Sequence, residues 1–119
     1  MPTQSLTDGL EKNTCADWHP HPSFRGVEMK TLVSGVMTGG RLSQHLVRVA
    51  PDCALELHAH SAQCELHLVI EGQAVASLED QEITYSPGQI TAIPVGKLHA
   101  VRARSEGITL LASFTPALT

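Results

Sequence analysis

From residue 27 onward, apolar and polar residues alternate in short runs that are bounded by glycine, proline or acidic residues. Such runs are typical of half-buried strands, and no window keeps a 3.6-residue period over three helical turns. The predicted strands cover residues 28–34, 41–50, 53–58, 64–70, 73–79, 82–85, 89–93, 99–103 and 108–115. Eight or nine short strands at this spacing indicate one all-β domain, an antiparallel sandwich or barrel.

The first 26 residues follow a different pattern. They are mostly polar and contain the run Trp18-His-Pro-His-Pro22, in which two prolines within three residues exclude a regular helix. We therefore expect residues 1–26 to form an irregular N-terminal lead-in and residues 27–119 to form the β-domain.

Composition narrows the class of protein. A chain of 119 residues has room for one domain, and 42% apolar and 17% charged residues with a net charge of −4 disfavour disorder. The basic residues are dispersed, so we expect no nucleic-acid partner. No apolar stretch has the length of a membrane span and the N-terminus does not resemble a signal peptide, so we expect no membrane partner and a cytoplasmic location.

Three cysteines agree with that location. Cys15, Cys53 and Cys64 are odd in number and do not have metal-binding spacing, which fits a reducing compartment. We expect Cys53 and Cys64 to be buried as small hydrophobic residues.

Histidine is unusually frequent in this chain. There are seven histidines but only two Phe, one Trp and one Tyr. A buried imidazole must be hydrogen-bonded or bound to a metal, so histidine is a poor substitute for apolar core residues. The histidines are therefore the first candidates for chemistry.

The segment His58-Ala-His60-Ser-Ala-Gln-Cys-Glu65 carries the strongest signal. Residues two apart in a strand point to the same side, so His58 and His60 can face one point. Residues 61–64 can reverse the chain, which lets Glu65 face that point from the next strand. Two nitrogens and one carboxylate suit Fe, Mn, Ni, Zn or Cu. Taken alone, the spacing also fits exposed strand histidines beside an unrelated glutamate.

A second segment runs from Gly88 to His99, with a turn at Pro94–Gly96 before the returning strand. Together the two segments resemble the motifs of the cupin superfamily, G-x5-H-x-H-x3,4-E-x6-G and G-x5-P-x-G-x2-H-x3-N. The matching residues are His58, His60, Glu65, Gly72, Gly88, Pro94, Gly96 and His99. The chain departs from the motifs at Asp52 and Ala103, neither of which is a ligand position. The resemblance covers roughly residues 27–115.

This resemblance implies a double-stranded β-helix, the jelly-roll cupin barrel, in a small single-domain protein. It also implies one divalent transition metal on His58, His60, Glu65 and His99. A weaker likeness joins the region before the barrel to the cupin-like domain of zinc-containing anti-sigma factors, which implies that the lead-in packs on the barrel. The residues that carry it are Trp18, Pro22, Gly26, Val27 and Lys30.

Other polar residues leave alternatives open. His67 follows Glu65 by two positions and so shares the ligand face, as a catalytic proton-transfer residue or as a hydrogen-bonded spacer between barrel layers. His45 lies on an apolar face and can also point inward, and Gln63 is an alternative ligand to Glu65. His19 and His21 are predicted to be loop residues rather than a second metal site.

The leading functional prediction is a metal-dependent enzyme of the oxygenase (dioxygenase), isomerase or lyase type that acts on a small polar metabolite. The alternative is a non-catalytic metal- or ligand-binding sensor or regulatory module, which the small size and the lack of an obvious charge clamp favour. We also expect a homodimer through apolar outer faces, with Leu110, Ala112 and Phe114 as candidates.

Overall fold

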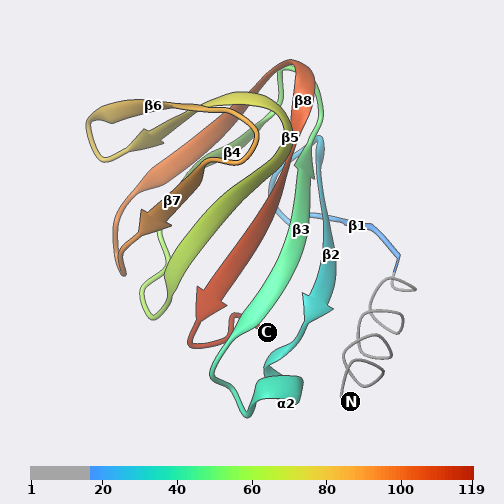
Figure 1. Ribbon diagram of the computed structural model, residues 1–119, viewed down its shortest axis with the longest axis vertical. Helices are drawn as coiled ribbons and strands as arrows, with labels where there is room; N and C mark the ends of the chain where they lie inside the picture. Colours follow the sequence, from blue (N-terminus) through green and yellow to red (C-terminus); the bar gives the residue numbers. More distant parts are fainter. Residues whose placement is uncertain (1–16) are drawn as a thin grey trace.

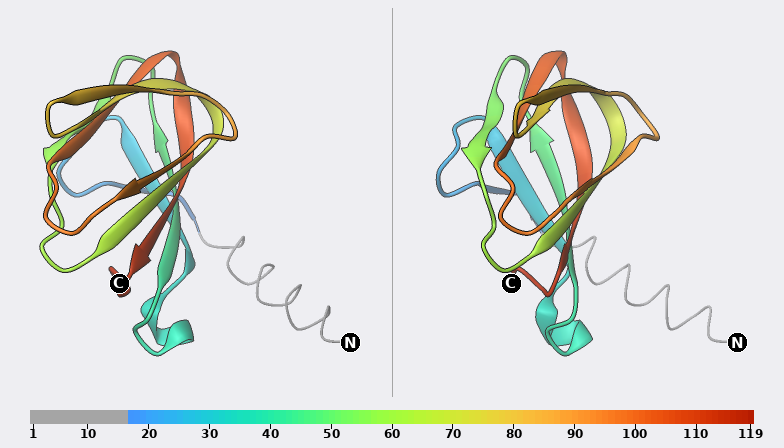
Figure 2. Two further views of the ribbon diagram at one scale, coloured as in Figure 1. Left: turned by 60° about the vertical axis from the view of Figure 1, so that its left-hand side comes forward. Right: turned by 90° about the vertical axis from the view of Figure 1, so that its left-hand side faces the viewer.

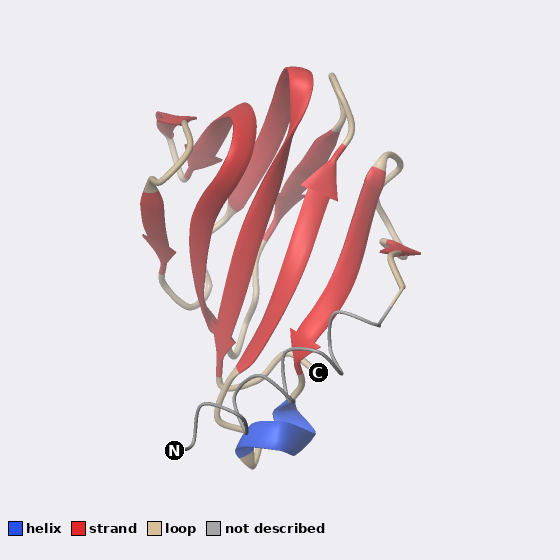
Figure 3. Cartoon of the chain, turned by 45° about the vertical axis from the view of Figure 1, so that its right-hand side comes forward, coloured by secondary structure: helices blue, strands red, loops and turns tan. Residues whose placement is uncertain are grey.

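The computed structural model describes residues 17–119, and strands make up nearly all of their regular structure (Figures 1 and 3). The elements are β1 (His19–Pro20), β2 (Val27–Val33), α2 (Gly35–Thr38), β3 (Ser43–Val49), β4 (Ala54–His58), β5 (Cys64–Leu78), β6 (Gln81–Tyr85), β7 (Ile90–Ile93) and β8 (His99–Thr115). Every strand pair is antiparallel. The all-β prediction is confirmed.

The strands form two layers that share β5 and β8. In the first layer β1, β2, β3, the second half of β8, the first half of β5 and β7 lie side by side. In the second layer β4, the first half of β8, the second half of β5 and β6 lie side by side. Figure 2 shows both long strands curving from one layer into the other around a common interior, as a jelly roll requires.

Two glycines make these long strands bend where the sequence pattern predicts turns. Gly72 and Gly107 have positive φ angles of 83° and 74°, and the register of β5 against β8 shifts on both sides of residue 72. A Cβ atom on Gly72 would collide with the Gly107 carbonyl oxygen. The predicted strands 64–70 and 73–79 are therefore one element, as are 99–103 and 108–115, because the glycines form bulges rather than reversals.

The core fills the space between the layers. It includes the residues predicted for the dimer surface, so that choice of residues is wrong. Leu110, Ala112 and Phe114 are buried, with 0%, 1% and 3% of their surface exposed, so they do not form an outer apolar face. Alternation along β8 directs these side chains inward and leaves Leu111 on the outer side.

The described part of the lead-in contacts the first layer. β1 pairs with β2 through His19–Met29 and Pro20–Glu28, and the Arg48 guanidinium lies 4.0 Å from the centre of the Trp18 ring. The predicted boundary at residue 26 stays a prediction, and residues 1–16, which include Cys15, lie outside the described residues.

The structure adds two short elements that the sequence pattern did not predict, β1 and α2. Cys53 and Cys64 are free thiols and are only half-buried, whereas the sequence pattern predicts that they are buried. Within residues 17–119, no helix has the length and apolar character needed to cross a membrane.

Candidate metal centre

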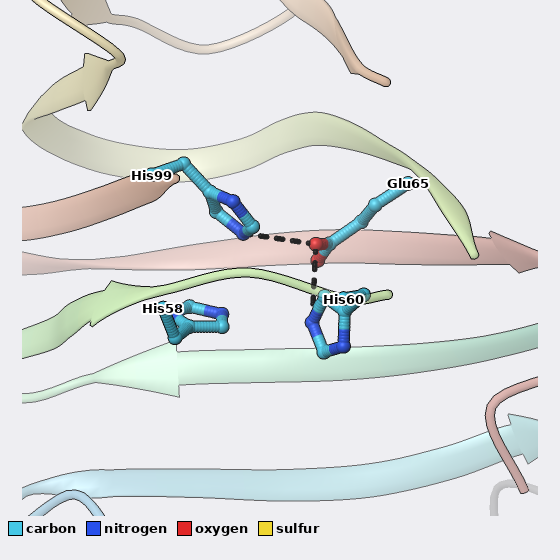
Figure 4. A group of neighbouring side chains, drawn as sticks. All are labelled: His58, His60, Glu65 and His99. Carbon is cyan, nitrogen blue, oxygen red and sulfur yellow. Dashed lines mark ion pairs between the residues drawn. The ribbon is translucent and has the colours of Figure 1, made fainter. Parts of the chain in front are cut away.

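Four side chains converge at one end of the space between the layers (Figure 4). His58 ends β4, His60 lies in the following turn, Glu65 begins the paired part of β5, and His99 begins β8. One ligand atom from each of the four residues lies within 4.8 Å of the others. Pairing of His58 with His99 in the β4–β8 ladder brings the fourth residue to the three that are close in sequence. The four predicted ligand residues therefore lie together.

The backbone orients two of these imidazoles in the same way. His58 Nδ1 lies 2.6 Å from the Glu56 carbonyl oxygen, and His99 Nδ1 lies 2.9 Å from the Lys97 carbonyl oxygen. A carbonyl only accepts, so each Nδ1 carries the proton and donates. Each Nε2 is left with a free lone pair, and hydrogen bonding of the other ring nitrogen is the usual arrangement of metal-binding histidines.

The two carboxylate oxygens of Glu65 have different partners. Its Oε2 accepts a hydrogen bond of 2.7 Å from His67 Nε2. Its Oε1 lies 3.1 Å from His99 Nε2 and 3.6 Å from His60 Nε2, the two ion pairs drawn in Figure 4. Oε1 and His99 Nε2 are nonetheless both buried without a hydrogen-bond partner. Buried polar atoms in this state are costly, and a cation between a carboxylate oxygen and imidazole nitrogens would satisfy both. The residues present therefore fit a divalent transition metal.

The electrostatics favour the metal-binding forms of three of these four side chains, Glu65, His58 and His60. Burial opposes ionisation of Glu65, but the hydrogen bond from His67 and the close approach of His99 lower its pKa well below the ordinary value. Burial lowers the pKa values of His58 and His60, which keeps both rings neutral near pH 7. His99 differs, because Glu65 and the Lys97 carbonyl outweigh its burial and raise its pKa.

His67 lies behind the cluster rather than in it. Its side chain is buried, with Nε2 bonded to Glu65 and Nδ1 2.9 Å from the Tyr85 hydroxyl oxygen. The Nε2–H therefore donates to the carboxylate, and Nδ1 accepts from the Tyr85 hydroxyl. Burial raises the pKa of Tyr85 to about 12. The geometry is that of a residue that positions Glu65, and the predicted catalytic role of His67 stays a prediction.

A cavity of about 220 Å³ adjoins the cluster. Three of the cluster residues and His67 line it, together with apolar side chains and a short turn of the lead-in. The lining residues outside the cluster are His21, Ser23, Phe24, Met29, Val47, Leu55, His67, Phe114 and Leu118. This cavity is the space in which a small molecule would meet a bound metal.

The other candidate residues lie elsewhere. His45 is buried between Thr31 and Ser43, at 3.1 Å from each hydroxyl, and does not line the cavity. The Gln63 amide donates to the Ala117 carbonyl at 3.4 Å and is not part of the cluster.

The sequence pattern does not assign His21 to the cavity. His21 lines the cavity, whereas His19 is exposed on β1, so the two do not form a site of their own. The paired histidines around Pro20 were the only sequence signal, and they do not reveal that this loop reaches the barrel.

Comparisons with known proteins agree with this architecture. The Cupin domain family profile matches residues 45–114. The chain is 27% identical over 88 residues to the alginate biosynthesis protein AlgA of Pseudomonas aeruginosa. The aligned region covers 74% of this chain but only 16% of that protein.

Solved structures show the same fold. KdgF from Halomonas sp. superposes with a TM-score of 0.77 at 20% identity, over 87% of this chain and 91% of that one. A predicted oxalate decarboxylase from Thermotoga maritima gives 0.79 at 17% identity, over 87% and 96%. An RmlC-like cupin from Shewanella frigidimarina gives 0.75 at 16% identity, over 88% and 87%. With a family profile that covers more than half of its residues and with a jelly-roll barrel, this chain belongs to the cupin family.

Proposed function

We propose that the protein is a metal-dependent enzyme that binds one divalent transition metal (Fe, Mn, Ni, Zn or Cu) through His58, His60, Glu65 and His99. The observation that carries the proposal is the pair of buried, unpartnered atoms, Glu65 Oε1 and His99 Nε2, at the centre of the four side chains. When bound, such a metal supplies Lewis-acid or redox chemistry to a small-molecule substrate. The proposed reaction is of the oxygenase, isomerase or lyase type.

The remaining residues of the site hold the ligands and shape the cavity. His67 and Tyr85 form a hydrogen-bonded chain that fixes the Glu65 carboxylate. Apolar side chains such as Leu55 and Phe114 limit the space for water beside the cluster. His67 also lines the cavity, and this supports its proposed role in proton transfer, although its Nε2–H is donated to Glu65.

Metal analysis of protein purified without a histidine tag tests the proposal. We expect one equivalent of transition metal in the wild-type protein and none in the His58→Ala, His99→Ala double variant. The matched control is His19→Ala, which removes an exposed histidine outside the cluster. A double variant that keeps a full metal equivalent would show that the site is wrongly assigned.

A second candidate function is a non-catalytic sensor or regulatory module. The absence of a lysine or arginine among the residues that line the cavity favours it, because there is no side chain to clamp a charged substrate. Bound iron with O2 uptake in the presence of a substrate supports the enzyme. A tightly bound zinc, with no exchangeable water in the spectrum of the cobalt-substituted protein, supports the sensor.

We further propose a homodimer, formed by the outer face of the first layer. Leu46, Leu111, Leu68 and Ile90 lie in register across β3, β8, β5 and β7, and Ile90 is 63% exposed. A continuous apolar row of this kind is uncommon on a monomer. A cytoplasmic location and the lack of nucleic-acid and membrane partners stay predictions.

A further inference from the structure

The turn that follows β1 is built against the candidate metal centre. His21 Nδ1 accepts hydrogen bonds from the backbone N–H groups of Ser23 and Phe24, at 3.0 and 3.3 Å. The His21 ring stacks on Phe24 with centroids 4.6 Å apart, and Phe24 in turn lies 5.5 Å from the ring of His58. The turn is therefore part of the cavity wall, although it precedes the barrel strands in sequence.

These hydrogen bonds determine which nitrogen of His21 can act on a ligand. Because Nδ1 accepts from two backbone N–H groups, the proton of the neutral ring is on Nε2. No acceptor for this Nε2–H is found among residues 17–119. His21, which lines the cavity, thus carries a hydrogen-bond donor on Nε2 in a fixed tautomer.

The rest of the cavity limits the charge that a ligand can carry. Apart from the cluster, His67 and the turn, the lining side chains are apolar, and none is a lysine or arginine. A divalent cation beside the Glu65 carboxylate leaves one net positive charge, which one anionic group neutralises. A second anionic group on the ligand would have no positively charged partner in the cavity, which disfavours its binding.

From this arrangement we propose that the His21–Phe24 turn is a specificity element and that the cavity takes a small ligand with one anionic head and an apolar body. His21 Nε2–H donates to an acceptor oxygen of the ligand, and the Phe24 ring packs against its apolar part. This inference rests on the proposed metal centre, so its test must measure metal binding and ligand selection separately.

The first test compares two five-carbon ligands on the cobalt(II)-loaded protein. Pentanoate has one carboxylate and an apolar end, whereas glutarate has a second carboxylate at that end. Calorimetric titration and the visible cobalt spectrum report binding without any reaction. We expect pentanoate to bind at least tenfold more tightly than glutarate, which corresponds to about 1.4 kcal/mol. Equal or tighter binding of glutarate would overturn the assigned ligand class.

The second test removes the donor and keeps the turn. In His21→Asn the side-chain oxygen can still accept from the backbone N–H groups of the turn, but the Nε2–H is lost. We expect a three- to tenfold weaker affinity for pentanoate, with one cobalt still bound. His19→Asn is the matched control, the same change at an exposed position outside the cavity, and we expect it to change neither value.

The two proposals fail in different ways. If the wild-type protein binds no cobalt at the cluster, the proposed metal centre is wrong. If cobalt binds but His21→Asn leaves the pentanoate affinity equal to that of His19→Asn, the metal centre stands and the role of His21 is wrong.

Discussion

At the scale of single residues, the candidate site depends on which ring nitrogen of each histidine is occupied. His58 and His99 are fixed by the same device, a hydrogen bond from Nδ1 to the carbonyl two residues earlier in the chain. His21 is fixed the opposite way, with Nδ1 as the acceptor. The same side chain is therefore prepared as a metal ligand at two positions and as a hydrogen-bond donor at a third.

Replacing His67 tests whether it positions Glu65. We expect His67→Leu to weaken zinc affinity about 10- to 100-fold, because Glu65 Oε2 loses its hydrogen bond. The Nε2 amide of His67→Gln can still donate, so we expect this variant to recover most of the affinity. Competition with a coloured chelator measures both. Equal zinc affinities for the Leu and Gln variants would contradict the positioning role.

We expect the ionisation of Tyr85 to lower the stability of the protein at high pH. Its pKa is raised by burial to about 12 from 10.0, so the unfolded chain loses the phenolic proton first. The stability due to the neutral phenol is complete below pH 10 and is lost as the pH rises to 12, about 2 to 3 kcal/mol in all. Chemical unfolding at pH 9, 10, 11 and 12 checks this.

The control for this prediction is Tyr85→Phe. Its free energy of unfolding should fall less than that of the wild-type protein between pH 10 and pH 12, since it has no phenol to ionise. Parallel pH curves for the two proteins would disprove the assignment.

The proximity of the four candidate side chains could be predicted from the sequence, from residue spacing and from the motifs that the chain shares with the cupins. The prediction places His58 and His60 on one face by strand alternation, whereas β4 ends at His58 and His60 lies in the turn after it; the second motif added His99. The contribution of His21 could not be predicted, since it depends on how a loop of irregular backbone crosses the barrel. The tautomers of His58 and His99 could not be predicted either, because each depends on the position of a single backbone carbonyl.

At the scale of elements, the glycines at the bends of β5 and β8 decide the architecture. The sequence pattern located both irregularities correctly but predicted turns there. Glycine and an acidic neighbour are equally typical of a turn and of a bulge. Only the pairing of residues on both sides of Gly72 with the same strand, β8, distinguishes the two.

A pair of glycine variants distinguishes the cost of a positive φ angle from the cost of a steric clash of the added Cβ atom. Gly72 and Gly88 have similar φ angles, 83° and 87°. A Cβ at residue 72 would meet the Gly107 carbonyl, whereas a Cβ at residue 88 meets no atom within 4 Å. We expect Gly88→Ala to lower the free energy of unfolding by about 1 kcal/mol and Gly72→Ala by clearly more, about 3 kcal/mol or above. Urea denaturation measures both, and equal losses would show that the close approach costs nothing.

At the scale of the whole molecule, the outer face of the first layer is the surface to test for association. We expect the wild-type protein to be a dimer at micromolar concentration and Ile90→Glu to be a monomer, because a charge would be buried in the interface. Leu57→Glu is the control, since Leu57 is 60% exposed on β4 in the other layer. Light scattering measures the mass, and a monomeric wild-type protein would exclude the dimer.

The sharing of β5 and β8 between both layers also determines how the molecule comes apart. Neither layer has a complete set of strands of its own, so one cannot lose its hydrogen bonds while the other remains intact. Unfolding should therefore be a single cooperative transition. The backbone amides of β5 and β8 around the bends should exchange with solvent only through that global event, and those of the edge strands β6 and β7 should exchange sooner.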